Sequence, residues 1–442
     1  MTARARSTMP ARRFAAALFV LAAVVALAAR TATAADIIPC PDDARACLLR
    51  TYYVAAEEVE WDYAPTGTNI FSNTPIDDDD GSSVYTKQDT GRIGRKYKKA
   101  IYNQYTDASF KTQVPRDPGM GLLGPVLRAE VGNVLKIVFI NKASMPFSMH
   151  PHGVSYDKDN EGANGGAEPG AGAEVAPGGN FTYIWQVPER AGPMSKEPGS
   201  VQLWGYHSHA NEGDIYAGLV GALAVYTPGS LNSTHQPKLG TDAYPIDKEV
   251  FQMYLVLDEN KSAYLADNVA KYAGNTTFTK DEQAQLAAAA KANPAINVTS
   301  APPTEDFNES NKMHSINGLF WGNLPGLNFT VGERVRWFLL GFGTEVDIHT
   351  VHWHGMTLTS EGQRRDVIDL LPASFRVADM VPDTEGNWLL HCHVGDHFMA
   401  GMIAFMNIVE KGAEDAKSAA GRVVAGAASL VAASVAVLAA WL

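Results

Sequence analysis

Cysteine is scarce in this sequence: only Cys40, Cys47 and Cys392 occur among its 442 residues. So few cysteines exclude the disulfide-rich scaffolds that stabilise small secreted domains. Cys40 and Cys47 are close enough in the sequence to form a small disulfide loop in an oxidising compartment, and the sequence leaves open whether they pair. Cys392 has no such neighbour, so its presence needs another explanation.

Positive charge is also in short supply. Lysine and arginine number 36 against 48 aspartates and glutamates, which gives a formal net charge of -12. This balance argues against nucleic acid as a partner, because nucleic acids bind basic surfaces. An acidic surface favours small cations instead. The four aspartates at 77–80 can attract cations, although such runs more often form solvated loops.

Long apolar runs are missing from the body of the chain and stand only near its two ends. Four arginines precede an apolar run at 14–29, and Ala32, Thr33 and Ala34 fit a cleavage site. We therefore expect residues 1–34 to be a secretory signal peptide, with an uncleaved signal anchor as the alternative.

Residues 412–442 contain a second apolar run, which has no charge from 423 to 442. This pattern is typical of a GPI-type lipid-anchor signal, and a single membrane helix is the alternative. Both predict a protein of the secretory pathway that is anchored through its C-terminus to the membrane, on the extracellular face of the cell surface. Seven N-glycosylation sequences agree with secretion. They begin at Asn180, Asn232, Asn260, Asn275, Asn297, Asn308 and Asn328.

Helical periodicity is mostly absent. Short apolar runs such as 134–140 and 335–340 are separated by clusters of Gly, Pro, Asn and Asp. This pattern is typical of all-β sandwiches. An Ala-rich stretch at 281–293 is the exception, and we expect it to form a surface helix within an insertion.

The chain also repeats itself at an interval of roughly 190 residues. A strand-like run followed by His-x-His-Gly occurs at 132–153 and again at 332–355, and each half ends in a second His-x-His. We therefore expect domain 1 at 48–228, a polar linker at 229–248 and domain 2 at 249–411.

Eight of the twelve histidines form four His-x-His pairs, two in each predicted domain. Side chains alternate along a strand, so both members of a pair point to the same side. Eight imidazoles exceed the needs of one ion and suit a cluster of three copper ions at the domain–domain interface. The pairs are His150/His152, His207/His209, His352/His354 and His391/His393.

Strand alternation separates a second set of ligands from the cluster. Cys392 lies between His391 and His393 and faces away from them, and His349 faces away from His352. With His397 and Met402 these residues form the donor set of a blue-copper electron-transfer site. Cys392 would bind one copper while its neighbours bind the cluster, which gives electrons a short bonded path. Domain 1 has Ser208 at the matching position and lacks this site.

These residues resemble the multicopper oxidases, and more narrowly the ceruloplasmin and hephaestin ferroxidases. The resemblance covers residues 52–410 and is most specific at 150–153, 206–209, 258–260, 309–318, 349–355 and 391–393. It implies two cupredoxin-like Greek-key β-sandwich domains and four copper ions. It assigns the type 2 copper to His150 and His352, the type 3 pair to His152, His207, His209, His354, His391 and His393, and the type 1 copper to His349, Cys392, His397 and Met402.

The resemblance also implies an iron-oxidising site beside the type 1 copper. Its matches are Glu309, His314 and Asp396, with a fourth carboxylate at Glu345. Carboxylates and an imidazole suit a hard cation such as Fe(II). By this resemblance the substrates are Fe(II) and O2, and an iron permease is a candidate partner.

The chain has two predicted domains where the larger relatives have six. In the six-domain ring the cluster lies between the last domain and the first, so a two-domain chain can rebuild the ring as a homotrimer. This resembles the two-domain small laccases and agrees with a closed heterologous interface. We then expect the cluster to lie between subunits and Glu345 to reach the iron site of an adjacent chain.

Three other functions compete with ferroxidase activity. A laccase-like oxidase of phenols or other organic reductants would use the same coppers but needs an open pocket near His397 in place of carboxylates. A non-catalytic copper carrier is disfavoured because all twelve family ligands are present. A two-domain nitrite reductase is disfavoured because its interface needs only three histidines.

Overall fold

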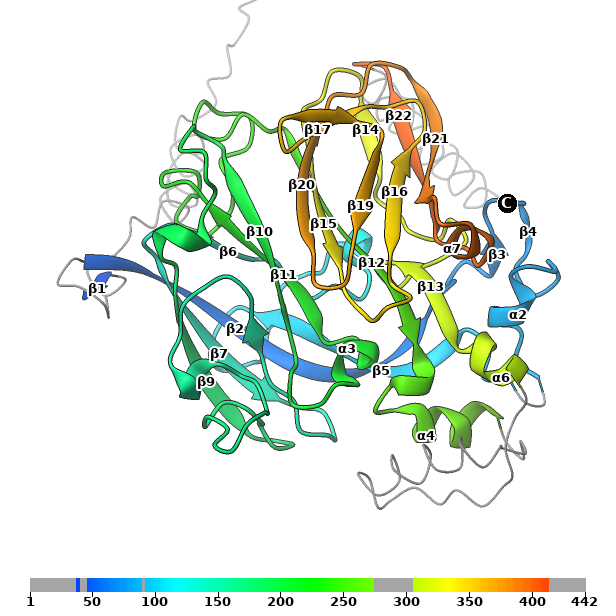
Figure 1. Cartoon of the computed structure of the whole chain (residues 1–442), viewed down its shortest axis with the longest axis horizontal. Helices are drawn as coiled ribbons and strands as arrows, with labels where there is room; N and C mark the ends of the chain where they lie inside the picture. The colour runs from blue at the N-terminus through cyan, green and yellow to red at the C-terminus, as the bar shows by residue number, and fades with distance from the viewer. Residues whose placement is uncertain (1–36, 40–45, 90–91, 274–304, 413–442) are drawn as a thin grey trace, which may run out of the picture.

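A computed structural model describes residues 37–39, 46–89, 92–273 and 305–412 of the chain. The predicted all-β fold is confirmed: strands dominate, and they form two β-sandwiches that lie side by side (Figure 1). The proposed signal peptide, the 281–293 helix, Cys40 and the apolar run at 423–442 lie outside the described residues. Within the described part, no helix is long and apolar enough to cross a membrane.

The first sandwich consists of two sheets. One has the order β1-β2-β7-β9, with β5 also paired to β2, and the other has the order β6-β11-β10-β8. The strands are β1 (Ile37–Pro39), β2 (Ala46–Asp62), β5 (Lys96–Tyr105), β6 (Leu127–Glu130), β7 (Val134–Asn141), β8 (His150–Pro151), β9 (Asn180–Gln186), β10 (Val201–His207) and β11 (Val220–Tyr226).

The second sandwich also has two sheets, in the orders β13-β12-β15-β20-β17-β18 and β14-β22-β21-β16-β19. The strands are β12 (Lys248–Asp258), β13 (Lys312–Ile316), β14 (Asn328–Thr330), β15 (Val335–Gly341), β16 (His349–Trp353), β17 (Leu358–Ser360), β18 (Gln363–Arg365), β19 (Val367–Leu370), β20 (Phe375–Met380), β21 (Gly386–Cys392) and β22 (Ile403–Val409).

The helices are short and lie in the connections between strands. The α-helices are α2 (Ser83–Thr86), α3 (Asp214–Ala217), α4 (Leu265–Asn268), α6 (Glu305–Ser310) and α7 (Gly395–Met399). Single turns occur at η2 (Pro118–Met120), η3 (Lys158–Asn160), η4 (Glu189–Ala191), η5 (Glu259–Lys261) and η6 (Val269–Ala273).

Three buried apolar clusters hold this arrangement together. One fills each sandwich, around Trp185 in the first and around Trp337 in the second. The third lies between the sandwiches, where the rings of Phe251 and Phe338 stack at a centroid distance of 4.2 Å.

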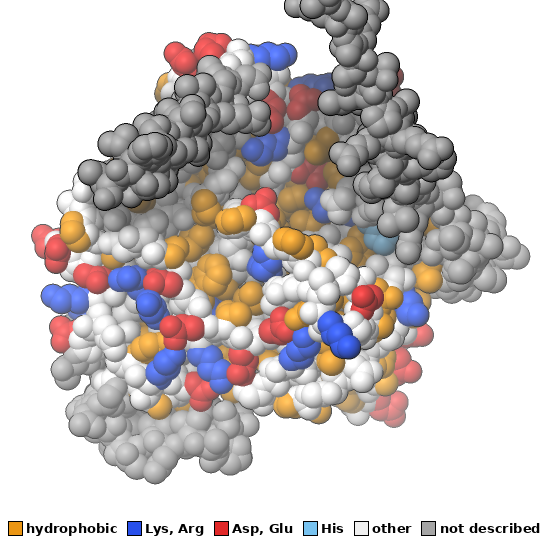
Figure 2. All heavy atoms as spheres, turned by 180° about the vertical axis from the view of Figure 1, so that it is seen from behind, with side chains coloured by type: hydrophobic (Ala, Val, Ile, Leu, Met, Phe, Trp, Pro, Cys, Tyr) orange, Lys and Arg blue, Asp and Glu red, His pale blue; other side chains and the backbone are white. Residues whose placement is uncertain are grey.

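On the face opposite to that in Figure 1, acidic and basic side chains are interspersed, with hydrophobic side chains between and above them (Figure 2).

One segment of the first half packs against the second half. It begins after β2 and contains β3 (Thr68–Asn69), β4 (Thr74–Pro75) and α2, all of which lie beside α6 and α7 (Figure 1). Near the end of β2, Trp61 Nε1 donates to the Gly318 carbonyl at 2.7 Å, and within the segment Thr66 Oγ1 donates to Asn323 Oδ1 at 2.6 Å. The predicted domain 1 therefore contributes residues to the surface of the predicted domain 2.

Candidate metal centre

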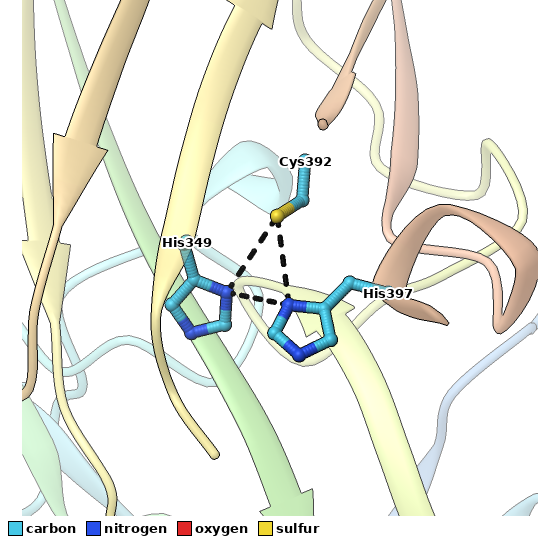
Figure 3. Close-up of side chains that lie close together, drawn as sticks. All are labelled: His349, Cys392 and His397. Atoms are coloured by element: carbon cyan, nitrogen blue, oxygen red, sulfur yellow. Dashed lines mark hydrogen bonds between the residues drawn. The ribbon is translucent and has the colours of Figure 1, made fainter. Parts of the chain in front are cut away.

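Three of the predicted ligands meet in the second sandwich. The Sγ atom of Cys392 lies 3.5 Å from His397 Nδ1 and 3.9 Å from His349 Nδ1. The two Nδ1 atoms are 3.1 Å apart, and all three side chains are buried. Figure 3 shows both rings turning Nδ1 toward the sulfur, from β16 and α7 respectively. A thiol and two imidazoles that converge on one point form a metal-binding arrangement.

Local strand geometry produces this arrangement. In β16 the buried positions alternate, so that His349 and Val351 face the core while His352 lies on the other face. Val351 stands opposite Cys392 in the β16–β21 ladder, which places Cys392 on the same core face. The backbone N–H of Thr350 donates to Cys392 Sγ at 3.5 Å, so the sulfur is already oriented by the neighbouring strand.

Met402 is fixed beside these residues by its backbone. Its carbonyl accepts from the Cys392 N–H at 3.1 Å, and its own N–H donates to the His397 carbonyl at 2.9 Å. The side chain is fully buried and belongs to the same apolar cluster as Cys392. The short helix α7 between Cys392 and Met402 therefore brings His397 back toward the sulfur.

The protonation states suit a metal rather than an ion pair. Burial, together with the adjacent His349, lowers the pKa of His397 to about 4, so this imidazole is neutral near pH 7 and keeps its lone pair. Burial also raises the pKa of the Cys392 thiol. A thiolate and neutral imidazoles with a thioether are the donors that copper prefers, and metal binding would deprotonate the thiol. These residues therefore fit copper.

A second group of histidines occupies the other face of β16 and β21. His352 and His391 are direct ladder partners, with His352 Nδ1 3.3 Å from His391 Nε2. His354 Nε2 lies 3.0 Å from the same atom, and the His393 ring is 5.3 Å from that of His352. Burial lowers the pKa of His391 to about 4. Four imidazoles thus converge on the side opposite to Cys392.

The four predicted ligands of the first sandwich form a third group. The His150 ring lies between 5.3 and 5.6 Å from those of His152, His207 and His209. Burial lowers the pKa of His152 to about 4 and that of His207 to about 3. The buried His152 Nε2 has no hydrogen-bond partner. An unpaired buried nitrogen costs free energy unless a ligand such as a metal satisfies it, so this group also fits copper.

The two four-histidine groups do not touch within one chain. Among the described residues, no ring contact joins a histidine of the first sandwich to one of the second. Instead, His152 contacts Phe375 at 5.3 Å and His207 contacts Phe342 at 5.9 Å. Each group is therefore half of the eight-histidine set that the sequence predicts.

The first sandwich carries a modified copy of the cysteine site. The N–H of Ser148 donates to Ser208 Oγ at 3.0 Å, as that of Thr350 does to Cys392. Ser208 Oγ in turn donates to Asp214 Oδ2 at 2.6 Å. Asp214 stands four residues before Gly218, as His397 stands four before Gly401, and both glycines have a positive φ. A hydrogen-bonded Ser–Asp pair thus replaces the soft ligands, in agreement with the predicted loss of a copper site here.

The four predicted iron ligands line one cavity. This carboxylate cavity has a volume of about 650 Å³, and its wall includes Glu309, His314, Glu345, Asp396 and His397. The His314 and His397 rings are 5.2 Å apart. The Nδ1 atom of His314 is 2.9 Å from the Lys312 carbonyl, so Nδ1 is the protonated nitrogen and Nε2 is left as the acceptor. Carboxylates and an imidazole therefore face the ring of a candidate copper ligand.

The structure corrects one expectation about this cavity. Glu345 lies in the same chain as Glu309, His314 and Asp396, so the prediction that it serves the site of an adjacent chain is wrong. The reason is local. Glu345 lies in the connection between β15 and β16, four positions before His349, which is the first residue of β16. The segment that positions one candidate copper ligand therefore brings its own carboxylate to the cavity.

Sequence reasoning missed three residues around these sites. Tyr85 lines the cavity, and its hydroxyl donates to Glu309 Oε1 at 3.2 Å. Lys312 forms an ion pair with the other oxygen of Glu309 at 3.0 Å. Asp347 is fully buried, accepts from the Val256 N–H at 2.7 Å and lies 3.3 Å from His349 Nε2. The sequence offered a clue to Lys312 and Asp347 alone, because each stands two residues from a predicted metal ligand, His314 and His349 respectively.

The aspartates at 77–80 directly precede residues of the cavity wall, and two of them make contacts that stabilise the fold. Asp77 pairs with Arg95 at 3.3 Å. Asp79 accepts from the backbone N–H groups of Gly81 and Ser82, at the start of α2, at 3.2 and 3.0 Å. These contacts agree with the solvated-loop interpretation.

Comparisons with known proteins give one consistent result. Two multicopper oxidase family models match residues 119–230 and 290–412. Human hephaestin is 39% identical over 81% of this chain, the mouse ferroxidase HEPHL1 is 39% identical over 80%, and sheep ceruloplasmin is 40% identical over 80%. A solved multicopper oxidase structure covers 84% of this chain and 92% of its own, with 19% identity and a TM-score of 0.46.

These curated relatives are much longer than this chain. The matched region is 29% of human hephaestin, 29% of the mouse ferroxidase and 32% of sheep ceruloplasmin.

Proposed function

This chain belongs to the multicopper oxidases, and from that premise we propose that it is a ferroxidase. Multicopper oxidases are copper-dependent, oxygen-using oxidoreductases with cupredoxin-like β-sandwich domains. The reaction oxidises four Fe(II) to four Fe(III) while O2 and four protons become two water molecules. The carboxylate cavity carries this proposal, because Glu309, Glu345 and Asp396 give it hard oxygen donors directly beside His397.

We assign four copper ions to the predicted ligands. His349, Cys392, His397 and Met402 would hold the type 1 ion, and the convergence of three of these side chains within 4.8 Å supports the assignment. Copper held there would supply one-electron transfer, and copper held by the eight paired histidines would supply the reduction of O2. Cys392 is bonded through the backbone to His391 and His393, so the chain itself connects the two groups of ligands. The cluster is assigned to His150 and His352 for type 2, and to His152, His207, His209, His354, His391 and His393 for type 3.

In this proposal the chain's own residues place Fe(II) for electron loss. Asp396 precedes His397 in α7 and is exposed at the cavity, so a cation held by Asp396 would lie next to a copper ligand. His314 would offer Nε2, because its Nδ1 is engaged by the Lys312 carbonyl. Glu309 supplies a carboxylate that its neighbours keep ionised. Burial raises the pKa of Glu309, but Lys312 and Tyr85 outweigh that effect and hold the pKa below its usual value.

The test compares two substrates in one pair of enzymes. We expect the double substitution Glu309→Ala/Asp396→Ala to lower kcat/KM for Fe(II) by at least about a hundredfold, because it removes two charged ligands, each worth roughly 1.5–3 kcal/mol. The kcat/KM for a phenol should stay within about threefold. A double variant that keeps full Fe(II) activity would support a laccase-like oxidase instead. Equal loss of both activities would indicate general damage at the type 1 site.

We further propose that each trinuclear cluster is completed by two copies of the chain, in a homotrimer. The separation of the two four-histidine groups within one chain supports this, since neither has the eight imidazoles alone. His152→Ala disables the first group and His354→Ala the second. If the cluster lies between chains, mixing these two inactive variants through unfolding, refolding and copper loading should restore activity. A mixture that stays inactive, or an active monomer in analytical ultracentrifugation, would contradict the proposal.

We also propose an extracellular, membrane-anchored location. The apolar runs at 14–29 and 423–442 support it, and both lie outside the described residues. A partner iron permease would act at the same membrane face. Detection of the mature chain at the cell surface, with release by a phospholipase that cleaves lipid anchors, would test the anchor.

A further inference from the structure

Lys312 forms part of the wall between two cavities. It lines the carboxylate cavity, and it also lines a neighbouring cavity of about 730 Å³. That second cavity contains the acidic residues Glu212 and Asp258. The Lys312 side chain is partly exposed, at 39%. One ammonium group therefore stands between two sets of carboxylates.

On the side of the carboxylate cavity, Lys312 pairs with the carboxylate of Glu309, which we propose as a ligand of Fe(II). Its Nζ is 3.0 Å from Glu309 Oε2, and the Tyr85 hydroxyl donates to Glu309 Oε1 at 3.2 Å. Both oxygens of Glu309 are thus satisfied by groups of the protein. A metal ion cannot use Glu309 fully until the ammonium moves away, because two cations on one carboxylate oxygen repel each other.

On the second side, Asp258 is within reach. Lys312 and Asp258 are direct partners in the antiparallel β12–β13 ladder, and the Cβ atoms of such partners lie about 4.5–5.5 Å apart. Among the residues that the structure describes, Asp258 has one ion pair, with Lys261 at 3.5 Å, and it lines the neighbouring cavity. The lysine stem is flexible, so its ammonium can rotate from Glu309 toward Asp258 without any movement of the strand.

We propose that Lys312 is a resident counter-ion that holds Glu309 in the iron-free cavity and withdraws toward Asp258 when a divalent cation binds. This rests on the proposed function of the carboxylate cavity. A doubly charged ion attracts Glu309 about twice as strongly as an ammonium at the same distance, whereas a monovalent ion gains nothing by exchanging with it. Lys312 therefore selects multivalent cations, and it also weakens their binding because the ion pair must first be broken. It is a positioning residue, since it acts through Glu309.

The experiment measures the binding of Co(II), a divalent ion that resembles Fe(II) and resists oxidation here, to the copper-loaded protein. Lys312→Met removes the competing ammonium, so the Kd for Co(II) and the KM for Fe(II) should both fall by about two- to fivefold, the size expected for one partly exposed ion pair. Asp258→Asn removes the alternative partner and should raise both by a similar factor. Asparagine still caps η5, so this variant should fold. Lys271→Met is the matched control, because it deletes an exposed ion pair with Glu60 outside both cavities.

Opposite shifts in the two variants distinguish withdrawal from a structural role. If Lys312→Met raises the Kd, Lys312 merely holds Glu309 in place and the inference is wrong. It is equally wrong if Asp258→Asn leaves the Kd unchanged or lowers it. The variant Glu309→Ala tests the proposed function of the cavity independently of Lys312. If Glu309→Ala leaves Co(II) binding and Fe(II) oxidation unchanged, the cavity is not the iron site and both proposals fail.

Discussion

At the scale of single residues, Asp214 shows what became of a metal site that lost its soft ligands. It is fully buried, and its Oδ1 atom has no hydrogen-bond partner. Burial raises the pKa of Asp214 to about 7, although Ser208 and the N–H of Asn211 oppose this. The folded state therefore binds a proton more tightly than the unfolded state. Stability from this group is complete below about pH 4 and is lost as the pH rises toward 7.

The substitution Asp214→Asn should remove this loss. Relative to the wild type, we expect the variant to be more stable by on the order of 2 kcal/mol at pH 8, where ionised Asp214 is costly, and about equally stable at pH 4.5. Urea unfolding of both proteins at the two pH values measures the difference. A stability difference that does not change between these pH values would contradict a raised pKa.

Residues around the candidate sites differ in how far the sequence could predict them. The placement of His349, His352 and Cys392 follows from strand alternation, which depends only on near neighbours in the chain. Tyr85 could not be predicted, because it reaches Glu309 through a contact across 224 positions. Glu345 was assigned to the wrong chain because the sequence does not reveal how the β15–β16 connection bends.

At the scale of elements, the segment with β3, β4 and α2 depends on a few contacts with the second sandwich. Asn323 carries several of them. Its Oδ1 accepts from Thr66 Oγ1 at 2.6 Å, and its Nδ2 donates to the Thr68 carbonyl at 3.0 Å. The Ile70 N–H donates to the Trp321 carbonyl at 3.0 Å. The sequence predicted strands by their alternation, but it gave no sign that this segment crosses to the other sandwich, because such docking depends on non-local contacts.

Asn323→Ala should loosen this segment. It removes three hydrogen bonds to the segment, each worth about 0.5–1.5 kcal/mol, so we expect at least roughly tenfold faster amide exchange within residues 66–86. Hydrogen–deuterium exchange with mass spectrometry measures this directly. Exchange in β16 and β21 should be unchanged, and a uniform increase across both sandwiches would show that the substitution destabilises the whole fold instead.

At the scale of the whole molecule, a buried ion pair helps to fix the two sandwiches together. Lys99 of β5 and Glu259 of η5 form an ion pair, and neither side chain has any exposed surface. Tyr63 also hydrogen-bonds to Glu259. Burial lowers the pKa of Lys99 and raises that of Glu259, which shows that desolvation opposes the charged state of both. Neither group can lose its partner cheaply.

Lys99→Met should therefore destabilise the protein by about 3–5 kcal/mol, because it leaves Glu259 charged or protonated in an apolar interface. Thermal unfolding of the copper-loaded protein measures the effect. Lys98→Met is the control: this neighbouring lysine pairs with Asp267 at 2.7 Å but is partly exposed, so its loss should cost less than about 1 kcal/mol. Equal effects of the two substitutions would contradict a special role for the buried pair.

The segment with β3, β4 and α2 also limits which parts of such a protein can function after a gene is split or duplicated. Gly81 and Tyr85 come from the first half of the chain, whereas Glu309, Glu345 and Asp396 come from the second, and all of them line the carboxylate cavity. A gene duplication that copied only one sandwich would produce a cavity with a missing wall. The smallest unit of duplication that keeps a complete cavity is therefore the pair of β-sandwiches. Since this pair corresponds to 29–32% of the relatives' length, those proteins are as long as about three such pairs.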